Sequence, residues 1–193
     1  MATLITEIRQ KFAQDEFEFS RHAVDQSILR RIQVQEIRMA IANGQIIEDY
    51  PYDKYGPSCL ISGFTALQRP IHLQCSYPNR PLIKIITVYE PNLQRWNYQF
   101  ICKDGTINLV EGGKPTMNNE TLVEKRVTYT LSLNGRLILI ENVPARVNEE
   151  TGEQFFSPAT VECLQRTVLD SQEPDRFIQI PVYSYSENSQ NVA

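Results

Sequence analysis

The hydrophobic period of the sequence changes once, at Asn43-Gly44, and this change constrains the fold more than any other feature. Before it, apolar residues recur at helical spacing, which predicts helices over residues 2–13, after Ser20 and from Val34 to Asn43. After it, β-branched and aromatic runs predict four strands, at residues 45–50, 58–65, 70–76 and 81–89. The first half is therefore predicted to be α+β, with N-terminal helices packed on an antiparallel sheet of about four strands.

The ends of two of these helices carry recognisable signals. Ser20 is the expected N-cap, because its hydroxyl can accept a hydrogen bond from a backbone N–H that the first turn leaves without a partner. Gly44 is the expected terminator of the second helix, since glycine readily adopts the left-handed conformation of a helix end.

The second half has a different character. Glycine, proline and asparagine punctuate residues 97–120, which predicts a linker. Asn134-Gly135 predicts a type I′ turn between two long strands, and Ser157-Pro158 predicts the start of a helix that runs to about Leu169. The expected organisation is an α+β domain over 1–96, a linker over 97–120, a small β-hairpin-and-helix domain over 121–183, and a flexible tail over 184–193. Residues 177–182 are expected to form a last strand or an extended arm.

Composition excludes several classes of protein. The net charge of −4 divides into +1 for residues 1–96 and −5 for residues 97–193, so the acidic half could sit against a basic site in the first half or could reflect simple compositional drift. No apolar run approaches the ~20 residues that a membrane span needs, and the N-terminus does not resemble a signal peptide. The four cysteines form no CxxC pair, so neither a metal site nor a disulfide framework is expected. We expect a cytoplasmic protein without a cofactor.

The densest basic cluster lies around the first of only two histidines. The cluster consists of Arg21, Arg30, Arg31 and Arg38. His22 is expected at a helix N-terminus, where free N–H groups and the macrodipole favour anions. This cluster could bind a phosphate. It could equally be a solvated helix face, with His22 as a capping or packing residue.

Residues 1–96 carry an ordered series of short motifs: Ser20-Arg-His22-Ala23, Arg30-x-Ile32, Glu36-Ile37, Gly44, Arg69-Pro-Ile-His72 and Val88-Tyr-Glu-Pro91 followed by Trp96. This series resembles the domain of unknown function 4258, which is related in fold to RelE/MqsR ribonuclease toxins. One position departs from the family, because Gln26 stands where an arginine usually follows the histidine by four residues.

Residues from about 122 to 169 resemble the YgiT-type zinc finger of MqsA-like antitoxins. The matching pieces are Thr128-Tyr-Thr-Leu131 with Gly135, then Ile140 to Val147, then Gly152-Glu153-x-Phe-Phe-Ser-Pro158. Asn148 and Thr151 occupy the positions of the family's CxxC cysteines, and neither can replace a thiolate ligand of zinc. We therefore expect the finger's fold without its metal.

The resemblance implies two functional classes. The first is a toxin–antitoxin-type protein, in which a metal-independent ribonuclease is restrained by the attached antitoxin-like domain through an intramolecular contact. Histidine suits general acid–base roles and arginine suits phosphate binding, so His22, Arg30 and His72 are the expected catalytic residues. Arg21, Arg31, Lys54 and Tyr55 are the expected contacts to RNA. The second class is a non-catalytic binding or regulatory protein built on the same folds, which recognises protein or nucleic acid. Homo-oligomerisation stays open.

Overall fold

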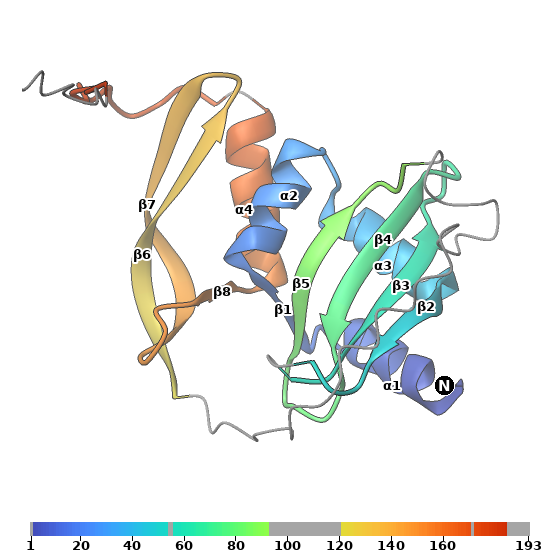
Figure 1. Cartoon of the computed structure of the whole chain (residues 1–193). Coiled ribbons are helices and arrows are strands. Elements are labelled where there is room, and N and C mark those ends of the chain that lie inside the picture. The colour runs from blue at the N-terminus through green and yellow to red at the C-terminus, as the bar shows by residue number, and fades with distance from the viewer. Residues whose placement is uncertain (1, 54–55, 93–120, 171, 185–193) are drawn as a thin grey trace, which may run out of the picture.

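A computed structural model describes residues 2–53, 56–92, 121–170 and 172–184 of the chain (Figure 1). The predicted linker, Trp96 and all but Ser184 of the predicted tail lie outside these residues. The elements follow in the order α1 (Ala2–Ala13), β1 (Phe17–Ser20), α2 (Arg21–Leu29), α3 (Val34–Asn43), β2 (Gln45–Tyr50), β3 (Ser58–Phe64), β4 (Pro70–Ser76), β5 (Ile83–Tyr89), β6 (Leu122–Leu133), β7 (Arg136–Asn148), β8 (Gln154–Phe156) and α4 (Pro158–Leu169). The predicted helices, the four predicted strands of the first half and the two long strands of the hairpin are present, and the α+β class is confirmed. Residues 177–182 form no strand and correspond to the extended arm that is the other expectation.

The prediction of a sheet of about four strands is wrong, because the described residues form one sheet of eight strands. Its order is β2-β3-β4-β5-β1-β8-β7-β6, so strands from both halves of the chain belong to the same sheet. Sequence reasoning missed β1 and β8, which have only four and three residues. Runs this short carry too little periodicity to be told from a loop or the edge of a helix.

Strand β1 joins the two halves of this sheet. It pairs in parallel with β5, where Phe17 lies opposite Ile83, and antiparallel with β8, where Phe19 lies opposite Phe156. Phe17, Phe19 and Phe156 are almost completely buried and belong to one hydrophobic core that contains residues from both halves. The backbone hydrogen bonds of β1 are therefore completed by β8.

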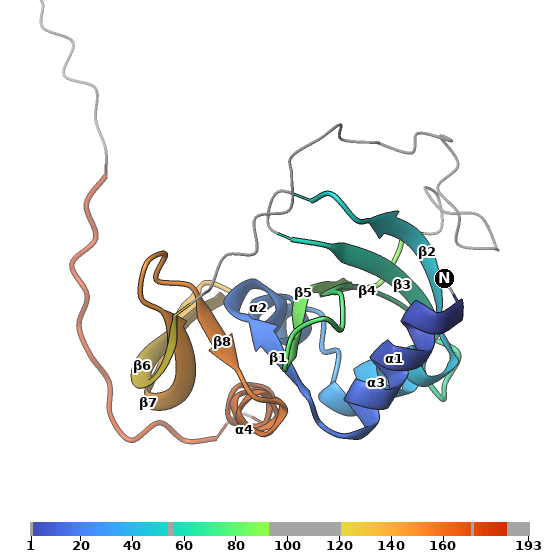
Figure 2. The same cartoon turned by 90° about the horizontal axis from the view of Figure 1, so that it is seen from below.

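The helices divide into two groups around the sheet. Helices α1 and α3 cover one face of strands β2–β5, whereas α2 and α4 lie between β5 and the β6–β7 hairpin (Figures 1 and 2). In α2 the side chain of Ser20 accepts a hydrogen bond from the Ala23 N–H at 3.1 Å, which confirms the predicted N-cap. None of the helices in the described ranges is long and apolar enough to cross a membrane.

The predicted reason for Gly44 is wrong, although α3 does end there. Gly44 has φ −76° and ψ 166°, which is extended backbone that any residue can adopt. A Cβ at this position would instead meet the carbonyl oxygens of Ala40 at 2.4 Å and Ser62 at 2.8 Å. Gly63 on β3 shows the same close approach, because a Cβ there would lie 1.9 Å from the Ala40 oxygen. These two glycines let α3 pack directly on the backbone of β3.

The hairpin turn follows its prediction closely. Asn134 and Gly135 have φ values of 51° and 76°, as a type I′ turn requires at both central positions. The flanking strands β6 and β7 pair from Leu133 opposite Arg136 to Leu122 opposite Asn148.

Arg69 holds the C-terminal end of α2 against the sheet. Its guanidinium donates to the carbonyl oxygens of Arg30 at 2.8 Å and Arg31 at 3.2 Å, and it forms an ion pair with Glu90 at 2.9 Å. It also lies 3.5 Å from a carboxylate oxygen of Glu36 on α3. The Arg69 guanidinium therefore satisfies helix-end carbonyls that have no partner within the helix.

We expect Arg69→Ala to lower the free energy of unfolding by about 2 kcal/mol, because several charge-assisted hydrogen bonds are lost together. Urea unfolding monitored by circular dichroism would measure the change. Arg136→Ala is the matched control, since Arg136 is exposed at the hairpin turn and its loss is expected to cost less than ~0.5 kcal/mol. Equal effects of the two substitutions would contradict this role of Arg69.

Candidate functional site

The three predicted catalytic residues occupy different environments. His22 is exposed near the N-terminus of α2, Arg30 is exposed at its C-cap, and His72 is fully buried in the middle of β4. Eight residues of α-helix separate His22 from Arg30 by about 12 Å along the helix axis. The two side chains therefore start from opposite ends of α2, and their catalytic roles stay predictions.

His72 lies on the sheet face opposite the core side chains of β4. Its neighbours Ile71 and Leu73 point into the hydrophobic core, so His72 points to the other face. There its Nδ1 lies 3.3 Å from the hydroxyl of Tyr89 on β5, and the two rings meet edge to face at 5.3 Å. Burial lowers the pKa of His72 to about 4, which keeps the imidazole neutral at physiological pH.

This pKa shift predicts a pH dependence of stability. The pKa of His72 is about 4 in the folded chain and ~6.5 when unfolded, so between these values only the unfolded chain binds the proton. Stability is therefore lost as the pH falls through this window, by about 2 kcal/mol between about pH 7 and about pH 5.

Urea unfolding at both pH values should reveal this loss, and His72→Gln should remove it. His22→Gln is the control, because His22 is exposed and its replacement should leave the pH dependence intact. An unchanged pH dependence in His72→Gln would contradict the assignment.

The predicted RNA-contacting arginines are partly engaged within the chain. Arg21 donates from Nη2 to the backbone oxygen of Thr130 on β6 at 3.2 Å and to its Oγ1 at 2.7 Å. Arg31 is exposed at a turn with φ 52°, and its carbonyl accepts from Arg69. Lys54 and Tyr55 lie outside the described residues.

A tyrosine of the hairpin completes the contact with α2. The hydroxyl of Tyr129 donates to Oδ1 of Asp25 at 2.6 Å, and the Arg21 guanidinium lies 5.8 Å from the Tyr129 ring centroid. Burial and the neighbouring Asp25 carboxylate raise the pKa of Tyr129 well above its usual range. The hairpin is thus fixed on α2, the helix that carries His22.

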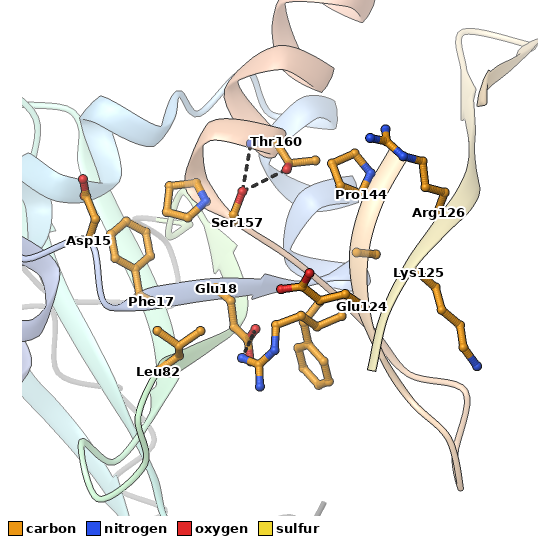
Figure 3. Close-up of a pocket in the computed structure, with 14 residues that line it drawn as sticks. Asp15, Phe17, Glu18, Leu82, Glu124, Lys125, Arg126, Pro144, Ser157 and Thr160 are labelled. Atoms are coloured by element: carbon orange, nitrogen blue, oxygen red, sulfur yellow. Dashed lines mark hydrogen bonds and ion pairs between the residues drawn. The ribbon is translucent and has the colours of Figure 1, made fainter. Parts of the chain in front are cut away.

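A hollow with a volume of about 530 Å³ lies at the junction of the two halves. Figure 3 shows the residues that line it. Its apolar lining includes Phe17 and Leu82 from the first half and Pro144 from the hairpin. Near its centre, Glu18 of β1 and Arg146 of β7 form an ion pair with 3.0 Å between Oε2 and Nη1. The Glu18 side chain is almost completely buried and that of Arg146 is 36% exposed, so this ion pair links the two halves at the edge of the buried interior.

The charges around this hollow balance. Its acidic residues are Asp15, Glu18 and Glu124, and its basic residues are Lys125, Arg126 and Arg146. A surface that neutralises phosphates would instead show a clear excess of positive charge. The chemistry of the hollow suits an occupant with apolar groups and no large net charge.

Sequence reasoning did not identify Glu18 or Arg146 as site residues. The alternation Phe17-Glu18-Phe19 could have indicated a strand with Glu18 facing away from the core. No local signal could have paired Glu18 with Arg146, because these residues are 128 positions apart and only the sheet brings them together.

The turn between β7 and β8 is closed by hydrogen bonds to Asn148. Oδ1 of Asn148 accepts from the N–H groups of Glu150 at 2.9 Å and Thr151 at 3.2 Å, as in an Asx turn. Gly152 follows with φ 74° and donates its N–H to the Asn148 carbonyl oxygen at 2.8 Å. Among the residues that the structure describes, no group of three or more His, Cys, Asp or Glu side chains could hold a metal ion.

Comparison with known proteins identifies one domain. Residues 19–90 match the family model of a domain of unknown function, DUF4258, so the chain contains a DUF4258 domain that extends from β1 to the end of β5. A leucine–tRNA ligase of Porphyromonas gingivalis is 29% identical over 101 residues, which are 52% of this chain and 10% of that protein. The chain thus spans about a tenth of the length of this relative. No solved structure gave a significant match.

Proposed function

We propose that this chain is a toxin–antitoxin-type protein whose antitoxin-like half is built into the toxin-like half, and that the assembled chain is a non-catalytic binding protein. The observation that carries the proposal is the continuity of the sheet through β1, with β8 completing the strand that leads directly into α2. An antitoxin-like half that shares a hydrophobic core with the toxin-like half cannot dissociate from it unless part of each half unfolds.

The environments of the expected catalytic residues also favour binding over catalysis. General acid–base catalysis requires a group with a pKa near the operating pH that reaches the substrate. His72 is buried with a pKa of about 4, and it lies on β4, whereas His22 and Arg30 lie at the two ends of α2. Metal-independent cleavage needs several such groups together.

The chemistry of the junction hollow favours a polypeptide segment as the binding partner. The apolar lining of Phe17, Leu82 and Pro144 would accept apolar side chains, and the balanced charges of the rim would bind residues of either sign. The hollow lacks the excess of positive charge that binding of RNA phosphates requires.

The enzymatic alternative is tested on the intact chain. Purified protein incubated with messenger RNA and EDTA should yield no more fragments than a buffer control, and His22→Ala should behave identically. Cleavage by the intact chain that is lost in His22→Ala would overturn the proposal in favour of a ribonuclease.

The binding role has a test of its own. Peptides selected by phage display on the intact chain should bind the wild type and Leu67→Glu. Leu67 is exposed in the loop that precedes β4, whereas Leu82 lies in the connection at the other end of β4. The selected peptides should not bind Leu82→Glu, which places a carboxylate in the apolar lining. Failure to select any peptide, or binding that Leu82→Glu leaves unchanged, would contradict the proposed site.

A further inference from the structure

Exposed apolar side chains concentrate on two segments of the second half. Ten large hydrophobic residues are exposed among those described, and seven of them lie on β7 or on residues 177–183. They are Leu137, Leu139, Phe177, Ile178, Ile180, Val182 and Tyr183. Large apolar side chains that gather on two segments of a protein surface mark an interaction site more often than single scattered ones do, so this concentration indicates an interaction surface.

The two segments are joined by an ion pair. Arg176, at the start of the extended segment, donates from Nη2 to both carboxylate oxygens of Glu141 on β7, at 2.8 and 2.9 Å. Leu137, Leu139 and Glu141 alternate along β7 and therefore point to the same face of the hairpin. The segment that follows α4 runs away from the body of the protein toward the C-terminus in both views (Figures 1 and 2). We call residues 176–184 the arm.

We propose that the outer face of β7 and the arm form the interface between two copies of this chain. The surface carries no net charge, because the arm's single charged residue, Arg176, is neutralised by Glu141. A two-fold axis places like groups against like groups, so a neutral apolar patch is compatible with itself whereas a charged patch would repel its copy.

The available area matches that of a stable dimer. Phe and Tyr side chains bury about 150–250 Å² each, so the seven exposed residues together offer on the order of 800 Å². A standard interface buries about 800 Å² on each partner. Phe177 and Tyr183, exposed at 90% and 88%, supply the aromatic anchors that dominate such interfaces.

The sequence of the arm is compatible with pairing as an edge strand. Pro181 has no N–H, so it is tolerated only where its nitrogen faces away from the neighbouring strand. Successive residues of a strand direct their backbone N–H and C=O groups to alternate sides. The backbone groups of Ile178, Ile180 and Val182 would therefore lie on the side opposite to the nitrogen of Pro181 and face the arm of the partner. The arms of two copies can therefore pair antiparallel while their apolar side chains cover Leu137 and Leu139.

Light scattering coupled to size exclusion tests the proposal on the full chain. At about 100 µM the mass should be twice the 22.3 kDa of one chain, because an interface with micromolar affinity is then saturated. The combined variant Phe177→Ser, Val182→Ser and Tyr183→Ser should weaken dimerisation at least ~100-fold, since it removes the anchors.

Leu67→Ser is the matched control, because Leu67 is 91% exposed but lies in the loop between β3 and β4. It should dimerise like the wild type, and circular dichroism should show the same fold for all three proteins. A wild-type mass of 22.3 kDa at the highest concentration would overturn the proposal. So would a dimer that the combined variant leaves unchanged.

Discussion

Gly63→Ala is expected to lower the free energy of unfolding by at least ~3 kcal/mol. The added Cβ would lie 1.9 Å from the carbonyl oxygen of Ala40, 2.6 Å from its carbonyl carbon and 2.9 Å from its Cα. All three are backbone atoms of α3, so no rotation of a side chain can relieve the clash. The helix would have to move away from β3, and the core contacts of Ile37 and Ile41 would loosen with it. Urea unfolding of the full chain measures this loss.

Gly135→Ala separates this clash from the general cost of replacing glycine. Gly135 has φ 76° and open space around its Cα, so alanine there suffers only backbone strain of ~1–2 kcal/mol. If Gly63→Ala costs no more than Gly135→Ala, the close approach of α3 to β3 is not a feature of the molecule in solution.

The second large effect is expected at the junction of the two halves. Phe156→Ala should lower the free energy of unfolding by about 3–5 kcal/mol, as is usual for a buried aromatic residue. Phe156 is 0% exposed, lies opposite Phe19 of β1, and meets the ring of Tyr129 edge to face at 5.9 Å. The cavity would therefore open between strands of both halves. Calorimetry should show one transition that moves down as a unit, because both halves share the core.

An independent second half would give a different calorimetric trace. Phe156→Ala would then lower only one of two transitions and leave the other at its wild-type temperature. Leu67→Ala is the control, because Leu67 is 91% exposed in the loop between β3 and β4 and contributes little to the core.

Local signals in the sequence predicted most of the elements correctly. The Ser20 and Ser157 caps, the Asn134-Gly135 turn and the helical spacing in α1 each arise from neighbouring residues, which act in the same way whatever the rest of the chain does. Such signals decide where an element begins and ends.

Features that depend on long-range packing were beyond these signals. Strand β1 has four residues, and its place at the centre of the sheet depends on pairing with β8 more than 130 positions later. Glycine is required at position 44 partly because a Cβ there would meet the carbonyl oxygen of Ser62. The residues next to Gly44 in the sequence do not indicate this contact. For His72 the complete burial likewise depends on the fold, because alternation along a strand decides only the face on which a side chain lies.

Amide hydrogen exchange on the intact chain tests most directly whether the two halves form one body. The N–H groups of β1, β5 and β8 should exchange at a common slow rate that corresponds to global unfolding, because β1 is bonded on both sides. Phe156→Ala should then accelerate exchange in all three strands together. Fast exchange across β6–β8 while β1 and β5 stay protected would mean that the second half opens independently, which would contradict the account.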